Sequence, residues 1–193
     1  CKKAATYDAI NNNQVLRRTE TINKVTSLEG GAHIIIAYPE SICEKVVAPK
    51  ILDSNRINLK IKEELYLDFL IEVLVDYGFA NVDFVYEPGQ FSIRGGIVDI
   101  FSFGNEWPYR LELFDEEIET IRTFNPIDQL SIRNISTLSI VPNINSKFDA
   151  TDQVSLFKIL PEKSLVWMVD EQFTLDRLQI CFENHRAAKE QIK

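Results

Sequence analysis

The chain has 193 residues, of which 45% are hydrophobic, so it can bury the core of one large or two small globular domains. Its 29 acidic and 21 basic residues give a formal net charge of −8, which argues against a long nucleic-acid-binding surface on the chain itself. The apolar runs are too short to cross a bilayer and no secretory leader opens the chain, so we expect a cytoplasmic protein without a membrane partner. The only methionine is Met168, which predicts a fragment of a longer protein.

The first part of the chain predicts a helix, a strand and a second helix. Residues 11–28 carry apolar side chains at helical spacing and are followed by a glycine pair that ends helices. Residues 33–37, HIIIA, predict a short buried strand. Residues 41–47 predict a helix, because Ser41 and Glu44 have the spacing of a capping box.

The middle of the chain predicts one helix followed by a run of hairpins. Residues 63–77 have apolar side chains at helical spacing, and Gly78 follows them. Alternating polar and apolar residues then predict strands at 82–86, 91–94, 96–103, 109–115, 118–124 and 135–141. Pro88-Gly89 is typical of a type II turn, Gly95-Gly96 of a bulge or tight bend, and Asp115-Glu116 of a less regular hairpin turn.

The last part of the chain, like the first, predicts a short strand between two helices. Residues 153–160 predict a short helix, 165–169 a second buried strand and 173–189 a helix. The fold class that we predict is therefore mixed α/β and α+β. A flanking α/β layer is built from residues 1–52 and 143–193, and an α+β domain of antiparallel hairpins with one main helix, residues 53–142, is inserted into it.

One predicted strand has an unusual face. If residues 109–115 are extended, Leu111 and Leu113 lie on one side and Arg110, Glu112 and Phe114 on the other. A large aromatic residue beside charged ones is typical of a protein-binding hot spot, and equally of an aromatic residue covered by a second layer. Arg94 is predicted to face solvent, where it could form one surface with Arg110 and Phe114.

No catalytic or metal site is predicted. The phosphate-loop pattern GxxxxGK[ST] is absent from the sequence, so we expect no cofactor in this fragment. Three cysteines without ligand spacing favour reduced thiols, and His33 and His185 lack a nearby nucleophile motif. Asp99 alternates with Ile97 and Phe101, which places its carboxylate toward the apolar side and predicts either an internal ion pair or hydrogen bonds to turn amides.

The runs GFANVDFVYEPGQFSIRGGIVDIF and PYRLELFDEEIETIRTFNPIDQLS resemble the second domain of the bacterial transcription-repair coupling factors (Mfd), which is similar to the excinuclease B subunit (UvrB). The segments RRTETINKV and HIIIAYPESICEKVV resemble the end of the preceding domain. The IRTFNPIDQLS stretch favours the coupling factors, while the alternative is a fragment of the excinuclease B subunit, an ATPase-like component of damage processing.

The resemblance implies a non-catalytic recruitment module that binds the excinuclease A subunit (UvrA) and so links removal of stalled RNA polymerase to nucleotide excision repair. It implies Arg94, Arg110 and Phe114 as the residues that contact the excinuclease A subunit. It also implies that the full-length protein is an ATP-dependent DNA translocase. That protein would use ATP and Mg, and would contact RNA polymerase and DNA through other domains.

Overall fold

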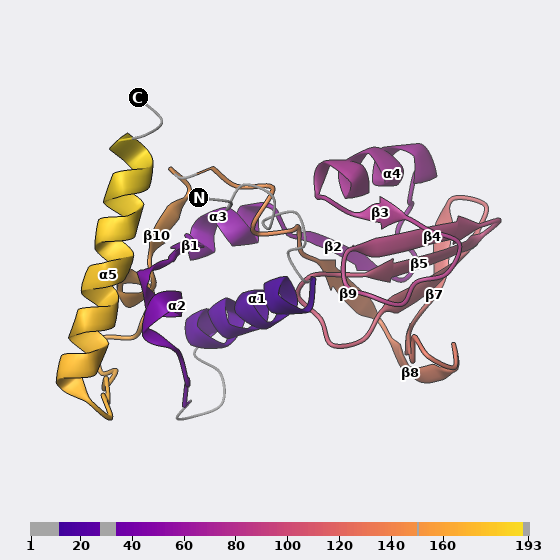
Figure 1. The fold of residues 1–193 in the computed structure, drawn as a ribbon. Helices are drawn as coiled ribbons and strands as arrows, with labels where there is room; N and C mark the ends of the chain where they lie inside the picture. Colours follow the sequence, from indigo (N-terminus) through magenta and orange to yellow (C-terminus); the bar gives the residue numbers. More distant parts are fainter. Residues whose placement is uncertain (1–11, 28–33, 150, 191–193) are drawn as a thin grey trace.

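The structure is a computed structural model that describes residues 12–27, 34–149 and 151–190 (Figure 1). Its helical elements are α1 Asn12–Ser27, α2 Pro39–Cys43, α3 Pro49–Ser54, α4 Leu67–Asp76, the 3₁₀ turn η1 Leu156–Lys158 and α5 Glu171–Glu190. Its strands are β1 Lys45–Val47, β2 Ile57–Lys60, β3 Ala80–Asn81, β4 Gln90–Arg94, β5 Ile97–Phe101, β6 Tyr109–Phe114, β7 Glu117–Phe124, β8 Ser131–Ile135, β9 Thr137–Ile140 and β10 Gln153–Ser155. Helices combined with antiparallel hairpins confirm the predicted fold class.

The largest element is a six-stranded sheet with the order β3-β4-β5-β6-β7-β8. Every neighbouring pair in it is antiparallel except β3 and β4, which are parallel. Two further pairs lie outside this sheet, β2 with β9 and β1 with β10. Consecutive strands of the sheet are joined by two-residue turns at 95–96 and 115–116 and by longer loops elsewhere, and its order follows the chain.

Three turns depend on residues that accept a left-handed backbone. Gly89 has φ +83°, as the second central position of a type II turn requires, and a Cβ there would overlap the ring of Phe103. Gly95 has φ +59° in the tight turn between β4 and β5. Asp115 has φ +54° between β6 and β7, which agrees with the tolerance of aspartate for this region.

One face of the six-stranded sheet forms the main core. Helix α4 lies beside this sheet in Figure 1, and its Leu70 and Leu74 are buried in the same cluster as the sheet residues. The sheet residues of this core are Phe91, Val98, Ile100, Tyr109, Leu111, Ile118 and Ile121. Leu59, Leu138 and Ile140 add the β2–β9 pair to it. The alternation of apolar residues along each strand thus selects the face that α4 covers.

The opposite face, called the outer face below, carries a smaller cluster and a row of polar residues. Val85, Phe101 and Phe124 form the cluster, with Val82 packed against it. The strand register places the polar row directly across the sheet, in the order Ser92, Asp99, Arg110, Arg122 and Asn134. The loop that follows β3 therefore covers one end of the outer face, because it carries Val82 and Val85.

Residues 39–47 and 153–177, from the two halves of the chain, meet on the side of the molecule away from the six-stranded sheet (Figure 1). β1 pairs with β10, and Arg177 of α5 donates a hydrogen bond of 2.7 Å from Nε to Glu40 Oε1 of α2. The predicted helix over 173–189 is confirmed as α5. The helix predicted over 11–28 is confirmed as α1 within the described residues.

The two buried strands predicted at 33–37 and 165–169 are wrong for the residues that the structure describes. Ile34 and Ile36 are 91% and 94% exposed in an irregular segment, and Leu165 and Val169 are 98% and 99% exposed. His33 lies outside the described residues. A continuous apolar run predicts a buried strand only where neighbouring strands can pair with it, and the described part of the chain supplies none to these segments.

Other predicted elements have different bounds or a different type. The helix predicted over 41–47 is confirmed only for residues 41–43, which lie in α2, and the one predicted over 153–160 is reduced to the 3₁₀ turn η1. Most of the remaining residues form β1 and β10, because these short segments pair with one another. Residues 82–86 form a loop, and the helix predicted over 63–77 is confined to α4. The elements α3, β2, β3 and β8 were not predicted from the sequence. Among the described helices none is long and apolar enough to span a membrane.

Candidate functional site

The outer face holds all three residues predicted to contact a partner. Arg94 ends β4, and Arg110 and Phe114 lie on β6. Leu111 on β6 is fully buried in the core, whereas Phe114 is 71% exposed. The parity predicted for this strand is therefore confirmed: Arg110, Glu112 and Phe114 face away from the main core.

Asp99 also lies on the outer face, which corrects the prediction that it points toward the apolar side. The register places Asp99 between Ser92 and Arg110, whereas its neighbours Val98 and Ile100 point into the core. Of the two predicted arrangements for Asp99, the structure shows the internal ion pair, because its side chain is fully buried and contacts two arginines.

Arg110 donates two hydrogen bonds to Asp99. Its Nε donates to Oδ1 at 2.6 Å and its Nη2 to Oδ2 at 2.8 Å, a bidentate arrangement. The same Nη2 donates to Gln129 Oε1 at 3.0 Å, and the guanidinium lies 4.3 Å from the ring centroid of the buried Phe124. The hydrogen bonds to Asp99 raise the pKa of Arg110. The Arg110 side chain is only 14% exposed, so most of its contacts are with other residues of the chain.

Arg94 binds the other side of Asp99. Its Nη2 donates to Asp99 Oδ2 at 2.7 Å, and its Nη1 donates to the carbonyl of Asp83 at 2.5 Å and to Ser92 Oγ at 2.9 Å. Its guanidinium lies 4.9 Å from the ring centroid of Phe84. The Arg94 side chain is 37% exposed, more than twice the fraction of Arg110, so it is the more accessible cation of the pair.

Phe114 lies at the end of β6, next to the hairpin turn. The outward-facing residue before it on the strand is Glu112, which pairs across the sheet with Ile97 and Thr120. Phe114 itself pairs with Glu117. Its position at the sheet margin explains its exposure, because the covering loop with Val85 lies over the other end of the outer face.

Glu112 is neutralised by its own neighbours. Its Oε1 accepts a hydrogen bond of 2.5 Å from Arg122 Nη2, and its Oε2 accepts one of 2.8 Å from Thr120 Oγ1. The bond from Arg122, and then that from Thr120, lower the pKa of Glu112. Glu112 therefore adds little uncompensated negative charge beside Phe114.

The structure brings Arg94 and Arg110 together through Asp99 and places Phe114 farther along the same face. Sequence reasoning missed two residues of this surface, Phe84 and Gln129. Gln129 has φ +62° in the turn after β7, and its Nε2 donates to Pro126 O at 2.8 Å and to Val85 O at 3.4 Å. The Asn125-Pro126 pair marks a turn, but only the folded chain places its Gln129 against Arg110.

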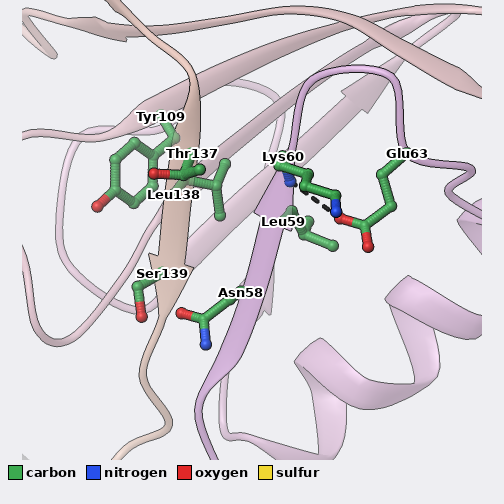
Figure 2. A pocket seen from close by; sticks show the side chains of 8 residues that line it. All are labelled: Asn58, Leu59, Lys60, Glu63, Tyr109, Thr137, Leu138 and Ser139. Carbon is green, nitrogen blue, oxygen red and sulfur yellow. Dashed lines mark hydrogen bonds between the residues drawn. The ribbon is translucent and has the colours of Figure 1, made fainter.

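A separate hollow of about 590 Å³ lies over the β2–β9 pair (Figure 2). Asn58 and Ser139 face it from adjacent strands, and its charged lining residues are Lys60 and Glu63. The backbone N–H of Lys60 donates to Glu63 Oε2 at 3.0 Å. None of the predicted contact residues lines this hollow. Within the described ranges no group of three or more His, Cys, Asp or Glu could hold a metal ion.

Comparison with known proteins assigns a class to the part of the chain that carries this surface. Residues 57–145 match the family model of the UvrB interaction domain. This segment contains the whole six-stranded sheet, helix α4 and the β2–β9 pair, and it includes Arg94, Arg110 and Phe114. The match to the UvrB interaction domain model therefore covers the part of the chain that carries the outer face.

Two bacterial relatives match a longer part of the chain. The chain is 36% identical over 126 residues to the transcription-repair-coupling factor of Bacillus subtilis (strain 168). These 126 residues are 65% of this chain and 10% of that relative. The chain is 28% identical over 138 residues to the factor of Escherichia coli (strain K12), covering 70% of this chain and 12% of the relative. These matches confirm the resemblance to the UvrB-like module of bacterial transcription-repair-coupling factors. The chain spans about a tenth of the length of these relatives.

Proposed function

We propose that this chain is a non-catalytic recruitment module that binds the excinuclease A subunit (UvrA) through the outer face of its sheet. The observation that carries the proposal is an exposed Phe114 on the same face as an Arg–Asp–Arg cluster whose central carboxylate is buried, within a segment that matches the UvrB interaction domain model. In such a surface the aromatic ring enters an apolar pocket of the partner, and the arginine nearby donates charged hydrogen bonds.

The coupling role follows from the relatives. They are named transcription-repair-coupling factors, so we propose that recruitment of the excinuclease A subunit by this module links stalled RNA polymerase to nucleotide excision repair. Contacts with RNA polymerase and DNA, and the use of ATP and Mg, would belong to other parts of a full-length protein. The negative net charge of this chain agrees with a protein partner rather than with direct DNA binding.

Titration calorimetry with purified excinuclease A tests the proposal. Phe114→Ala is the sharpest variant, because Phe114 is exposed and its truncation leaves the Asp99 ion pairs intact. We expect it to lose at least about 1 to 2 kcal/mol of binding free energy. Arg110→Ala should also weaken binding by at least this amount, but it removes a partner of buried Asp99, so its fold must be checked by circular dichroism.

Phe69→Ala provides the matched control. Phe69 is 67% exposed, close to the value of Phe114, but it lies on α4, on the core side of the sheet. Binding by the Phe69→Ala variant should equal that of the unmodified chain. Unchanged affinity of both Phe114→Ala and Arg110→Ala would contradict the proposal.

A further inference from the structure

The loop between β3 and β4 is held firmly against the outer face. Its Val82 and Val85 pack on the small apolar cluster with Phe101 and Phe124. The carbonyl of Asp83 accepts a hydrogen bond of 2.9 Å from Ser92 Oγ, and the backbone N–H groups of the following turn are bound by Gln90 Oε1. The loop is therefore part of the folded surface, and the side chains that it directs outward have defined positions.

Phe84 is one of these outward-directed side chains. It lies between the carbonyl of Asp83, which binds Arg94, and the buried Val85, yet it is 50% exposed. Its ring is 4.9 Å from the guanidinium carbon of Arg94. Phe84 thus has the same combination of features as Phe114, an exposed aromatic ring close to charged residues on the outer face.

The strand register places Phe114 on one side of Arg94, and the β3–β4 loop carries Phe84 on the side of Phe101 and Phe124. Arg94 pairs with Ile97, which pairs with Glu112, and Phe114 is the next outward-facing residue beyond Glu112. A segment crossing the outer face would therefore meet an apolar ring, a cation and a second apolar ring.

The hydrogen-bond donors of Arg94 indicate what could lie over the cation. Both Nη1 hydrogens and one Nη2 hydrogen are occupied by Asp83, Ser92 and Asp99. Nε–H and the second Nη2 hydrogen have no partner in the described part of the chain. Unoccupied N–H donors on a partly exposed guanidinium are suited to bind a carboxylate of a partner.

We propose that Phe84 is a second aromatic anchor of the docking surface, and that Arg94, between Phe84 and Phe114, receives a carboxylate of the partner. The occupant is a segment of the excinuclease A subunit with an acidic side chain flanked by apolar ones, so the inference rests on the proposed function. The accessible positive charge of Arg94 and the apolar rings around it provide the complementarity for such a segment.

Calorimetry with the excinuclease A subunit tests the anchor with four variants, Phe84→Ala, Phe84→Leu, Phe114→Ala and the control Phe69→Ala. Phe84→Ala should raise the dissociation constant about tenfold or more. Phe84→Leu should keep most of the affinity, because leucine still fills an apolar pocket although it cannot hold Arg94 through a cation–π contact. Phe69→Ala should bind like the unmodified chain.

A salt series tests the carboxylate. If Arg94 meets a charged group, the dissociation constant of the unmodified chain rises between about 0.05 M and about 0.5 M NaCl. That of Arg94→Gln should start higher and rise less steeply, while the bidentate Arg110–Asp99 pair preserves the fold. Equal salt dependence of the two proteins would overturn the assignment of a carboxylate.

The outcomes separate this inference from the proposed function. Absence of binding by the unmodified chain would overturn both. Binding that is weakened by Phe114→Ala but unchanged by Phe84→Ala would overturn only the second anchor. Equal losses of affinity for Phe84→Leu and Phe84→Ala would also overturn the second anchor. They would show that Phe84 only holds Arg94 in place through its cation–π contact.

Discussion

Arg110 and Asp99 form a bidentate ion pair on the outer face of the sheet, with Nε–Oδ1 and Nη2–Oδ2 distances of 2.6 and 2.8 Å. The Asp99 side chain is fully buried, so its charge depends on this pair and on Arg94 for compensation. The strands bring the two residues directly opposite one another. The ion pair thereby fixes the guanidinium groups in the middle of the candidate docking surface.

Asp99→Asn should destabilise the fold, because it leaves two arginines without their buried counter-charge while preserving the size of the side chain. Breaking a buried ion pair from one side costs roughly 3 to 5 kcal/mol, and the partial exposure of Arg94 places the expected loss near the lower end. Urea unfolding measures it. Glu112→Gln is the control, because it breaks a more exposed pair and should cost at most about 1 kcal/mol. Equal midpoints for Asp99→Asn and the unmodified chain would contradict this prediction.

Phe114→Ala should leave stability nearly unchanged, whereas Leu111→Ala on the same strand should not. Phe114 is 71% exposed, and substitutions at such positions usually change the free energy of unfolding by less than about 0.5 kcal/mol. Leu111 is fully buried, so its truncation should cost about 2 to 5 kcal/mol. Thermal unfolding followed by circular dichroism compares the two. A large loss for Phe114→Ala would show that the ring stabilises the sheet instead of serving a partner.

The contribution of Glu112 to stability should depend on pH. Hydrogen bonds from Arg122 and Thr120 lower its pKa in the folded chain below the ordinary value of 4.5. The unfolded chain therefore binds a proton more readily, so this stabilisation is present above about pH 4.5 and is lost as the pH falls through the folded pKa. The difference in unfolding free energy between the unmodified chain and Glu112→Gln should shrink over that range. A difference that stays constant from about pH 7 to about pH 3 would refute the linkage.

Gly89→Ala should destabilise the fold much more than Gly95→Ala. Both glycines have positive φ, which costs an L residue about 1 to 2 kcal/mol. A Cβ at Gly89 would lie 2.2 Å from Phe103 Cζ, while none of the neighbouring atoms lies within 4 Å of a Cβ at Gly95. Overpacking of the buried Phe103 should add about 1 to 3 kcal/mol for Gly89→Ala alone. Equal losses in urea unfolding would show that the Phe103 ring moves aside freely.

Local patterns predicted the hairpins of this fold well. The strands β4 to β7 lie within one or two residues of their predicted ranges, and the positive-φ positions in the β4–β5 and β6–β7 turns are held by Gly95 and Asp115. The helices α1 and α5 follow from helical spacing in the same way. These features depend on residues close together in the chain, which is why a single sequence contains them.

Predictions that needed a distant partner were less successful. Residues 33–37 and 165–169 have the composition of buried strands, but their described residues are exposed because the described chain pairs no strand with them. β1 and β10 were predicted as parts of helices, because their pairing joins residues that are far apart in the sequence. The hydrophobicity of a short segment does not identify its neighbours.

The sequence by itself determined that Arg110, Glu112 and Phe114 share the face opposite Leu111, since side chains alternate along an extended strand. Only the tertiary structure decided what each residue does there. It buried Asp99 between Arg94 and Arg110, brought Gln129 and Phe84 onto the same surface and left Phe114 exposed. The physical reason is that strand parity is a local property of the backbone, whereas burial and ion pairing depend on which strands and loops pack together.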